Sequence, residues 1–247
     1  MKICSPVLVA VVGAFLFASG SAQAAPAVTG VFNLPAQPVR AALGPDGNTW
    51  VTLASADPDI ARITPDGTVT SFTSPEIDFP VGITWGSDNK MWVTGTNYIA
   101  QFQVTNPGAI QKTTVLQIGT ANDIINGVDG RLWTASGATA FRITPDETPS
   151  ITKILIDVPG FSARGITSTP LDTVWIANGD AGNPGMLPMS TAGIAGALVA
   201  TPDGMVQDAA SDSKGQIAFT NPTASVGRIG LINSGVLAPL TAAAPAL

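Results

Sequence analysis

The 247-residue sequence contains no histidine and only one cysteine. Without an imidazole to activate a hydroxyl, serines such as Ser136, Ser168 and Ser211 cannot form a Ser-His-Asp catalytic triad. Charged residues are also scarce, at 11% of the chain, and the 17 acidic residues outnumber the 11 basic ones. This balance argues against nucleic acid or an anionic lipid surface as a partner, because both attract basic proteins.

The first 24 residues have the pattern of a secretory signal peptide. Lys2 precedes an apolar run over residues 7–18, which is followed by the small-residue ending Ala22-Gln23-Ala24. We therefore expect cleavage before Ala25 and a secreted or extracytoplasmic protein without a stable membrane anchor. The single cysteine, Cys4, lies before the apolar run, so the mature chain has no cysteine, and it is long enough to bury a core without disulfides.

Four tryptophans recur at a nearly constant spacing. Trp50, Trp92, Trp133 and Trp175 are 42, 41 and 42 residues apart, and Ala218 follows 43 residues later in a similar segment. We call these five positions the Trp slots. A period of this length predicts a repeat architecture. The aligned segments are RAALGPDGNTW (40–50), GITWGSDNKMW (82–92), DIINGVDGRLW (123–133), GITSTPLDTVW (165–175) and DAASDSKGQIA (208–218).

Each segment has the pattern of a strand, a tight turn and a second strand that carries the Trp slot. Three residues before each slot stands a residue type that accepts a positive φ, as a hairpin turn requires. These residues are Gly47, Asn89, Gly130, Asp172 and Gly215. Two more apolar runs rich in Val, Ile, Thr and Phe follow each slot, and the 26 Gly and 20 Pro disfavour helices. The sequence predicts an all-β fold, a five-bladed β-propeller of four-stranded antiparallel blades, over residues 25–241.

Two segments compete to complete the last blade. Residues 28–34 have the pattern of an extra strand before the first repeat, and residues 236–241 have the pattern of a fourth strand in the last one. Propellers often close their ring by letting a strand from one terminus complete the blade formed by the other, which removes an open sheet edge. We expect residues 28–34 to pair in the last blade and residues 242–247 to form a disordered tail.

The segments GPDGNTWVT, IARITPDGTVTSF and VGITWGSDNKMWVTG resemble the repeats of virginiamycin B (streptogramin) lyase-type propellers, relatives of the NHL-like superfamily. The resemblance covers essentially all of the mature chain, although residues 165–202 are degenerate in the third strand of their blade. It implies a metal-assisted elimination that opens a cyclic ester, with histidine as the base and carboxylates near the metal.

The positions that match the family's catalytic residues do not carry that chemistry. The histidine position precedes the inner strand of each blade, and the residues there are Val39, Val81, Asn122, Arg164 and Gln207. The glutamate position is three residues after the Trp slot, and the residues there are Leu53, Gly95, Ser136, Asn178 and Asn221. None of the ten is a base near neutral pH or a carboxylate. We therefore do not expect streptogramin lyase activity.

Polar residues at the start of the inner strands form the predicted ligand-binding set. The residues are Arg40, Asn122, Asp123, Arg164 and Asp208. We expect them at the axial mouth of the propeller, where they could bind a small polar ligand or a divalent cation, calcium or magnesium. The alternative is that these charges only neutralise one another inside the channel. Adjacent positions also point to opposite faces of a strand, so Arg164 need not meet Asp123.

Two functions remain open at this point. The first is an exported, monomeric binding module for a small polar ligand or another protein. The second is a cation-assisted lyase or lactonase-type hydrolase with Asp123 or Asp208 as the base, although nearby arginine would oppose the upward pKa shift that this role needs. Oxygen-rich loops could also bind calcium, but such loops are more often solvated turns. The residues concerned are Asp57, Asp59, Asp180 and Asn183.

Overall fold

The computed structural model describes residues 30–57, 59–113, 119–146, 148–201, 204–222, 228–233 and 236–240. The predicted signal peptide and the predicted tail over residues 242–247 lie outside these ranges. The chain divides into Met1–Val31 and Phe32–Leu247, and every described strand belongs to the second unit. None of the described residues forms a helix long and apolar enough to cross a membrane.

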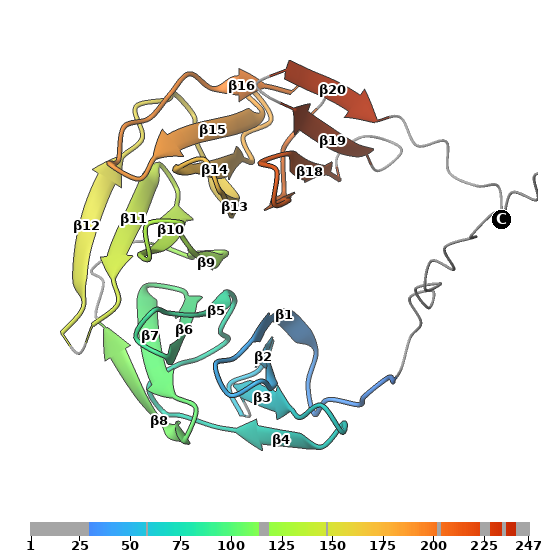
Figure 1. Ribbon diagram of the computed structural model, residues 1–247, viewed down its shortest axis with the longest axis vertical. Helices are drawn as coiled ribbons and strands as arrows, with labels where there is room; N and C mark the ends of the chain where they lie inside the picture. The colour runs from blue at the N-terminus through green and yellow to red at the C-terminus, as the bar shows by residue number, and fades with distance from the viewer. Residues whose placement is uncertain are drawn as a thin grey trace, which may run out of the picture. The chain divides into compact units, whose positions relative to one another are not determined.

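The unit Phe32–Leu247 consists of five antiparallel sheets of four strands each, which confirms the predicted five-bladed β-propeller (Figure 1). The strands of each blade pair in chain order from the centre outward, so every blade is a meander of three hairpins. The inner strands of successive blades contact one another from β1 to β17. These strands therefore surround the axis of the propeller, at whose mouth the ligand-binding residues are predicted.

The strands fall into four positions within the blades. The inner strands are β1 (Pro38–Leu43), β5 (Ile83–Trp85), β9 (Ile124–Asn126), β13 (Ala163–Thr169) and β17 (Asp208–Ser211). The second strands, which carry the Trp slots, are β2 (Thr49–Leu53), β6 (Lys90–Gly95), β10 (Leu132–Ser136), β14 (Thr173–Asn178) and β18 (Ile217–Asn221). The third strands are β3 (Ile60–Ile63), β7 (Tyr98–Gln103), β11 (Thr139–Thr144), β15 (Gly185–Ser190) and β19 (Arg228–Asn233). The outer strands are β4 (Val69–Phe72), β8 (Asn106–Thr113), β12 (Ser150–Leu155), β16 (Val199–Ala200) and β20 (Val236–Leu240).

The turn between the first two strands of each blade has the predicted backbone conformation. All five turn residues have φ between 59° and 82°, and they are Gly47, Asn89, Gly130, Asp172 and Gly215. Asn and Asp tolerate this left-handed region better than other residues with a side chain, and Gly has no Cβ to oppose it. The residue choice at these turns therefore fixes the hairpin that presents each Trp slot.

The Trp slots fill the space between successive blades. Trp50, Trp92 and Trp133 are completely buried, whereas Trp175 is only half-buried. In the first three blades an aspartate four residues earlier accepts a hydrogen bond from the indole nitrogen, at 3.0, 3.1 and 3.3 Å. These aspartates are Asp46, Asp88 and Asp129. In blade four the exposed Leu171 takes that position, so the predicted burial of the Trp slots is complete in three blades and partial in the fourth.

The prediction that residues 28–34 complete the last blade is wrong where the structure describes them. Residues 30–34 belong to no strand, and β20 pairs with β19 as the outer strand of blade five. The two strands are joined by a short connection, so their pairing closes a small loop and costs little chain entropy. The third strand of blade four departs from the repeat pattern in sequence, but the structure still contains it, as β15.

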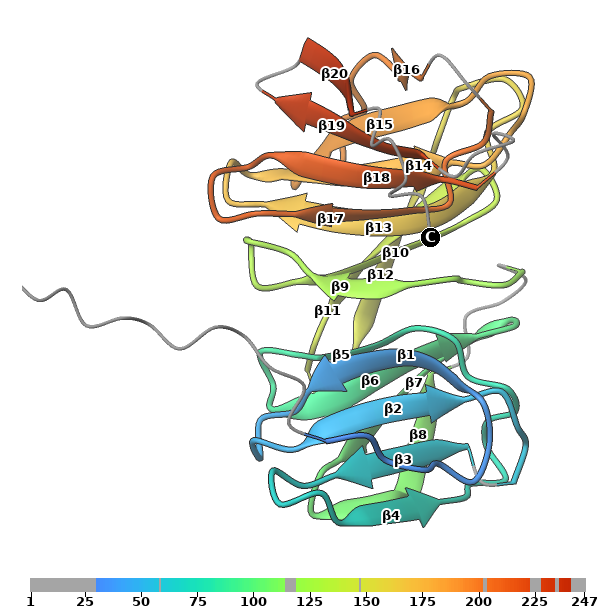
Figure 2. The ribbon, with the colours of Figure 1, turned by 90° about the vertical axis from the view of Figure 1, so that its right-hand side faces the viewer.

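The ring is open between blade five and blade one (Figures 1 and 2). Extended contacts join every other pair of successive blades, but none joins the described strands of these two. The end of the ring at blade one is covered by the chain itself, because Leu34 and Ala36 pack against the cluster of Val51, Leu53 and Ala61. The two ends of the ring therefore differ in how their apolar faces are covered.

Candidate functional site

Three of the predicted site residues come together at the start of the inner strands. Arg40 lies on β1, Asp123 directly precedes β9, and Asp208 begins β17. A register shift between Pro38 and Arg40 breaks the regular pairing of β1 with β2. Such bulges commonly redirect side chains next to functional sites. We call Arg40, Asp123 and Asp208 the axial cluster.

An ion pair joins blade one to blade five within the axial cluster. Arg40 Nη2 lies 2.9 Å from Asp208 Oδ2, and both side chains are about one-third exposed. Asp208 Oδ1 accepts a hydrogen bond of 2.9 Å from the amide of Ala209. Asp123 repeats this geometry, since its Oδ1 accepts a 2.9 Å bond from the amide of Ile124. Each carboxylate is therefore held by its own strand, and Arg40 is the one described cation paired with either of them.

The pKa of Asp123 is raised to about 6, mainly by burial and also by the nearby carboxylate of Asp208. Arg40 and the amides of Ile124 and Ile166 lower it, but they do not outweigh burial. Arginine opposes the upward shift, as predicted from the sequence, but it does not cancel the shift. Loss of solvent penalises the ionised form of Asp123 more than one guanidinium stabilises it.

Two glycines allow the inner strands to approach one another at the axial cluster. A Cβ on Gly82 would lie 2.9 Å from the backbone of Asp123, and a Cβ on Gly165 would lie 2.7 Å from the Cα of Asp208. Any larger residue at these positions would push neighbouring blades apart at the axis. Gly82 and Gly165 are the first residues of the aligned segments 82–92 and 165–175, but no role was predicted for them from the sequence. The available signal was the alternation of Gly with Asp and Arg at the first position of the five segments.

Asn122 and Arg164 lie away from the axial cluster. Asn122 donates a 3.3 Å hydrogen bond from Nδ2 to the carbonyl of Ala163. The side chain of Arg164 packs closely against Gly179. A Cβ added to Gly179 would lie only 2.5 Å from the Cγ of Arg164. The predicted ligand-binding set of five residues is therefore reduced to the three of the axial cluster, because adjacent positions on a strand face opposite ways.

The loop carboxylates belong to separate networks. Asp57 accepts a 2.7 Å bond from Thr73, while the buried Asp59 accepts one of 2.7 Å from the amide of Ser74. Asp180 accepts from the amide of Gly182 at 3.3 Å, and the carbonyl of Asn183 accepts from Asn178 at 2.7 Å. Within the described ranges, no three carboxylate, cysteine or histidine side chains are grouped so that they could hold a metal ion.

Comparisons with known proteins place this ring among the lyase-like propellers. A catalytically inactive virginiamycin B lyase from Staphylococcus aureus, a variant with a histidine replaced by alanine and solved with quinupristin, is 27% identical. The match covers 84% of this chain and 70% of that protein, with a TM-score of 0.73. A gluconolactonase from Xanthomonas campestris is similar in fold, with 15% identity over 81% of this chain and 74% of its own length and a TM-score of 0.58.

The calcium-binding protein regucalcin from Agrobacterium tumefaciens is also similar in fold, at 14% identity over 80% of this chain and 71% of its own, with a TM-score of 0.57. No curated protein matches the chain significantly. Residues 22–239 match the virginiamycin B lyase family, which is most of the sequence and all five blades except the end of β20. The chain therefore belongs to the virginiamycin B lyase family.

Proposed function

We propose that this chain is an exported, monomeric binding propeller of the virginiamycin B lyase family that has lost the family's elimination chemistry. The observation that carries the proposal is the absence of histidine from the sequence. In the Staphylococcus aureus relative, replacing one histidine by alanine gives a catalytically inactive protein. Elimination from an ester needs a base that titrates near neutral pH, and histidine is the residue that ordinarily does so.

Binding and catalysis are separable in that relative, because its inactive variant was solved with quinupristin. A chain without histidine can therefore keep a ligand-binding role on the same fold. We place the ligand site of this protein at the axial cluster of Arg40, Asp123 and Asp208, with Asn122 and Arg164 beside it rather than within it. Two carboxylates and one guanidinium favour a small polar ligand or a divalent cation, calcium or magnesium.

A second function has one specific observation in its favour, which is the raised pKa of Asp123. A carboxylate that titrates near 6 is a stronger base than an ordinary aspartate, so it could support a lyase or lactonase-type reaction with a bound cation. Arg40 counts against this alternative, because its positive charge lowers the pKa of Asp123 and so weakens that carboxylate as a base.

Purified protein is expected not to accelerate the loss of quinupristin or gluconolactone in the presence of magnesium or calcium. The product would be followed by mass spectrometry, with the Staphylococcus aureus lyase as the positive control for quinupristin. The rate should equal that of the solution without protein, since no histidine base is present. Turnover above that rate that disappears in Asp123→Asn would establish the enzymatic alternative and overturn the binding proposal.

The cation site is tested by thermal shift with calcium, magnesium or zinc. We expect at least one of these ions to raise the Tm of the wild-type protein, and Asp123→Asn/Asp208→Asn to lose that increase. Asp180→Asn is the matched control, because Asp180 lies in a loop network outside the axial cluster. If the paired variant keeps the full increase, or if Asp180→Asn loses it, the cation does not bind at the axial cluster.

A further inference from the structure

In the first four blades, one face of the sheet is always covered by the next blade. Trp50 packs with Ile83 and Met91 of blade two, and Trp92 packs with Ile124 and Leu132 of blade three. Trp133 and Trp175 repeat the arrangement with blades four and five. The side chain in the Trp slot therefore marks the face that receives the following blade.

The described residues leave the same face of blade five uncovered. On the second strand of each blade, the residue two positions after the Trp slot pairs with a residue on the third strand. In each of the first four blades this third-strand residue is fully buried, whether it is large or small. These residues are Ile60, Ile99, Ala140 and Met186. Their equivalent in blade five, Ile229, is 52% exposed, and Ala210 and Thr220 on the same face are exposed as well.

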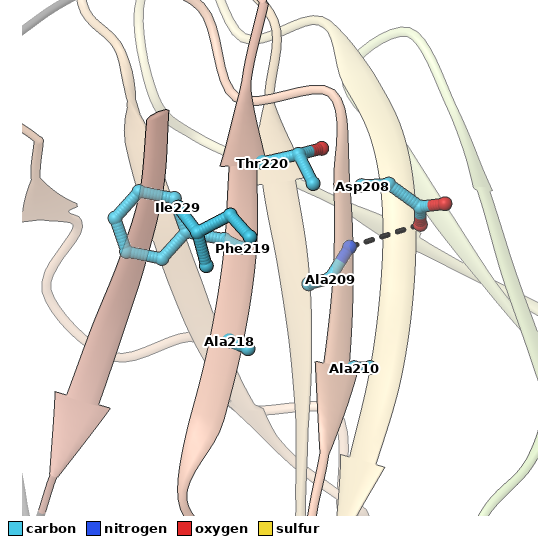
Figure 3. A pocket seen from close by; sticks show the side chains of 7 residues that line it. All are labelled: Asp208, Ala209, Ala210, Ala218, Phe219, Thr220 and Ile229. Atoms are coloured by element: carbon cyan, nitrogen blue, oxygen red, sulfur yellow. Dashed lines mark hydrogen bonds between the residues drawn. The ribbon is translucent and has the colours of Figure 1, made fainter. Parts of the chain in front are cut away.

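This face is hollowed where the other blades carry tryptophan. Ala218 occupies the Trp slot of blade five, and a hollow of about 190 Å³ lies over it (Figure 3). The lining residues come from β17, β18 and β19, and they are Asp208, Ala209, Ala210, Ala218, Phe219, Thr220 and Ile229. The hollow is therefore at the position that an indole ring takes in the first three blades.

The lining selects for an uncharged ligand. Its one charged residue, Asp208, is already paired with Arg40 at 2.9 Å, and its other oxygen accepts the Ala209 amide at 2.9 Å. The remaining side-chain surface is mostly alanine and isoleucine, with one threonine hydroxyl, because the ring of Phe219 packs toward blade four on the other face of the sheet. A cation or an anion would lose hydration there without gaining a partner. An apolar cavity of about 150 Å³ is enough to bind a benzene ring, so the volume suits an aromatic ring system.

We propose that the hollow on blade five binds a small uncharged aromatic molecule of about the size of indole, in the place where the repeat otherwise provides its own tryptophan. The site continues the series of four interfaces between blades, each of which packs an indole from the Trp slot against apolar side chains. Blade one does not provide the missing partner, because Leu34 and Ala36 already cover its apolar end. The site adjoins the axial cluster and shares Asp208 with it, but the rest of its lining is uncharged.

The probe is indole, titrated into the full protein and followed by saturation-transfer NMR and by calorimetry. The wild-type protein is expected to bind indole saturably, with a dissociation constant in the millimolar range or below. Ala218→Trp should abolish binding, because the new side chain fills the hollow, and Ile229→Ser should weaken it at least threefold. Ala56→Trp adds the same side chain in an exposed loop and should bind indole as the wild type does.

Three results would overturn the proposal. The first is no saturable binding of indole to the wild-type protein. The second is that the wild-type protein, Ala218→Trp and Ile229→Ser all bind indole equally well, which would mean that indole binds at another site. The third is concentration-dependent self-association in sedimentation that Ala218→Trp removes and that indole does not reverse, because the occupant of the hollow would then be a second copy of the chain.

Discussion

Replacing Trp133 by alanine is expected to lower the free energy of unfolding by about 3–5 kcal/mol, as large aromatic deletions in packed cores do. Trp133 is fully buried and packs against blade four through residues that include Ile166 and Leu187. The variant also loses the 3.3 Å hydrogen bond to Asp129 and the contact with the Arg142 guanidinium, which lies 5.8 Å from the ring centroid. The measurement is urea unfolding followed by circular dichroism.

Trp85→Ala is the matched control for this variant. Trp85 lies at the end of β5, is 43% exposed and is not at a Trp slot. Its replacement is expected to cost less than about 1 kcal/mol, because substitutions at exposed positions away from caps and cores have small effects. Equal losses in the two variants would contradict the assignment of the Trp slot as the packing residue between blades.

The repeat could be predicted from the sequence because its determinants are local. A tight turn needs a residue that accepts positive φ, and the residues Gly47, Asn89 and Asp172 show that requirement without any tertiary contact. The open end of the ring could not be predicted in this way. Ala218 continues the period as well as a tryptophan would, and only the structure shows that none of the described strands covers it.

The site was harder to predict than the fold because it joins distant parts of the chain. Arg40 and Asp208 are 168 positions apart, and their contact depends on how the inner strands curve around the axis. Arg164 occupies a neighbouring position in the repeat but faces Gly179 instead. The high pKa of Asp123 is also a property of burial, which residue spacing does not report. The prediction that depends on composition needs no knowledge of the fold. Because the sequence contains no histidine, no arrangement of its strands can supply a histidine base.

A second buried carboxyl makes stability depend on pH in an unusual direction. The pKa of Asp59 is raised to about 6, mainly by burial and also by the carboxylates of Asp78 and Asp57, against the lowering effect of the Ser74 amide. No described donor reaches Asp59 Oδ1, which is buried. Asp59 and Asp123 therefore both hold a proton in the folded protein at a pH where the unfolded chain, with a pKa of 3.8, has released it.

The sign of the effect follows from proton linkage. Between pH 4 and 6, Asp59 and Asp123 bind more protons in the folded state than in the unfolded state, so their contribution to the free energy of unfolding falls as pH rises. The contribution of the two groups is fully present below their unfolded pKa and is lost as pH rises through their folded pKa, about 6. Asp46, whose pKa is lowered by its bonds to Trp50 and Asn48 in spite of burial, acts in the opposite direction but below this window.

Asp59→Asn is therefore expected to stabilise the protein at pH 7.5 and to have a much smaller effect at pH 4.5. One unit of pKa shift corresponds to about 1.4 kcal/mol, so the gain at pH 7.5 has an upper limit of about 3 kcal/mol. The amide oxygen can still accept the Ser74 hydrogen bond. Urea unfolding at both pH values measures the effect, with Asp157→Asn as the control because Asp157 is exposed. Two outcomes would contradict this explanation. One is a gain in the free energy of unfolding of Asp59→Asn that is the same at pH 4.5 and pH 7.5, and the other is an equal gain in Asp157→Asn. Either would mean that removal of a buried charge does not cause the stabilisation.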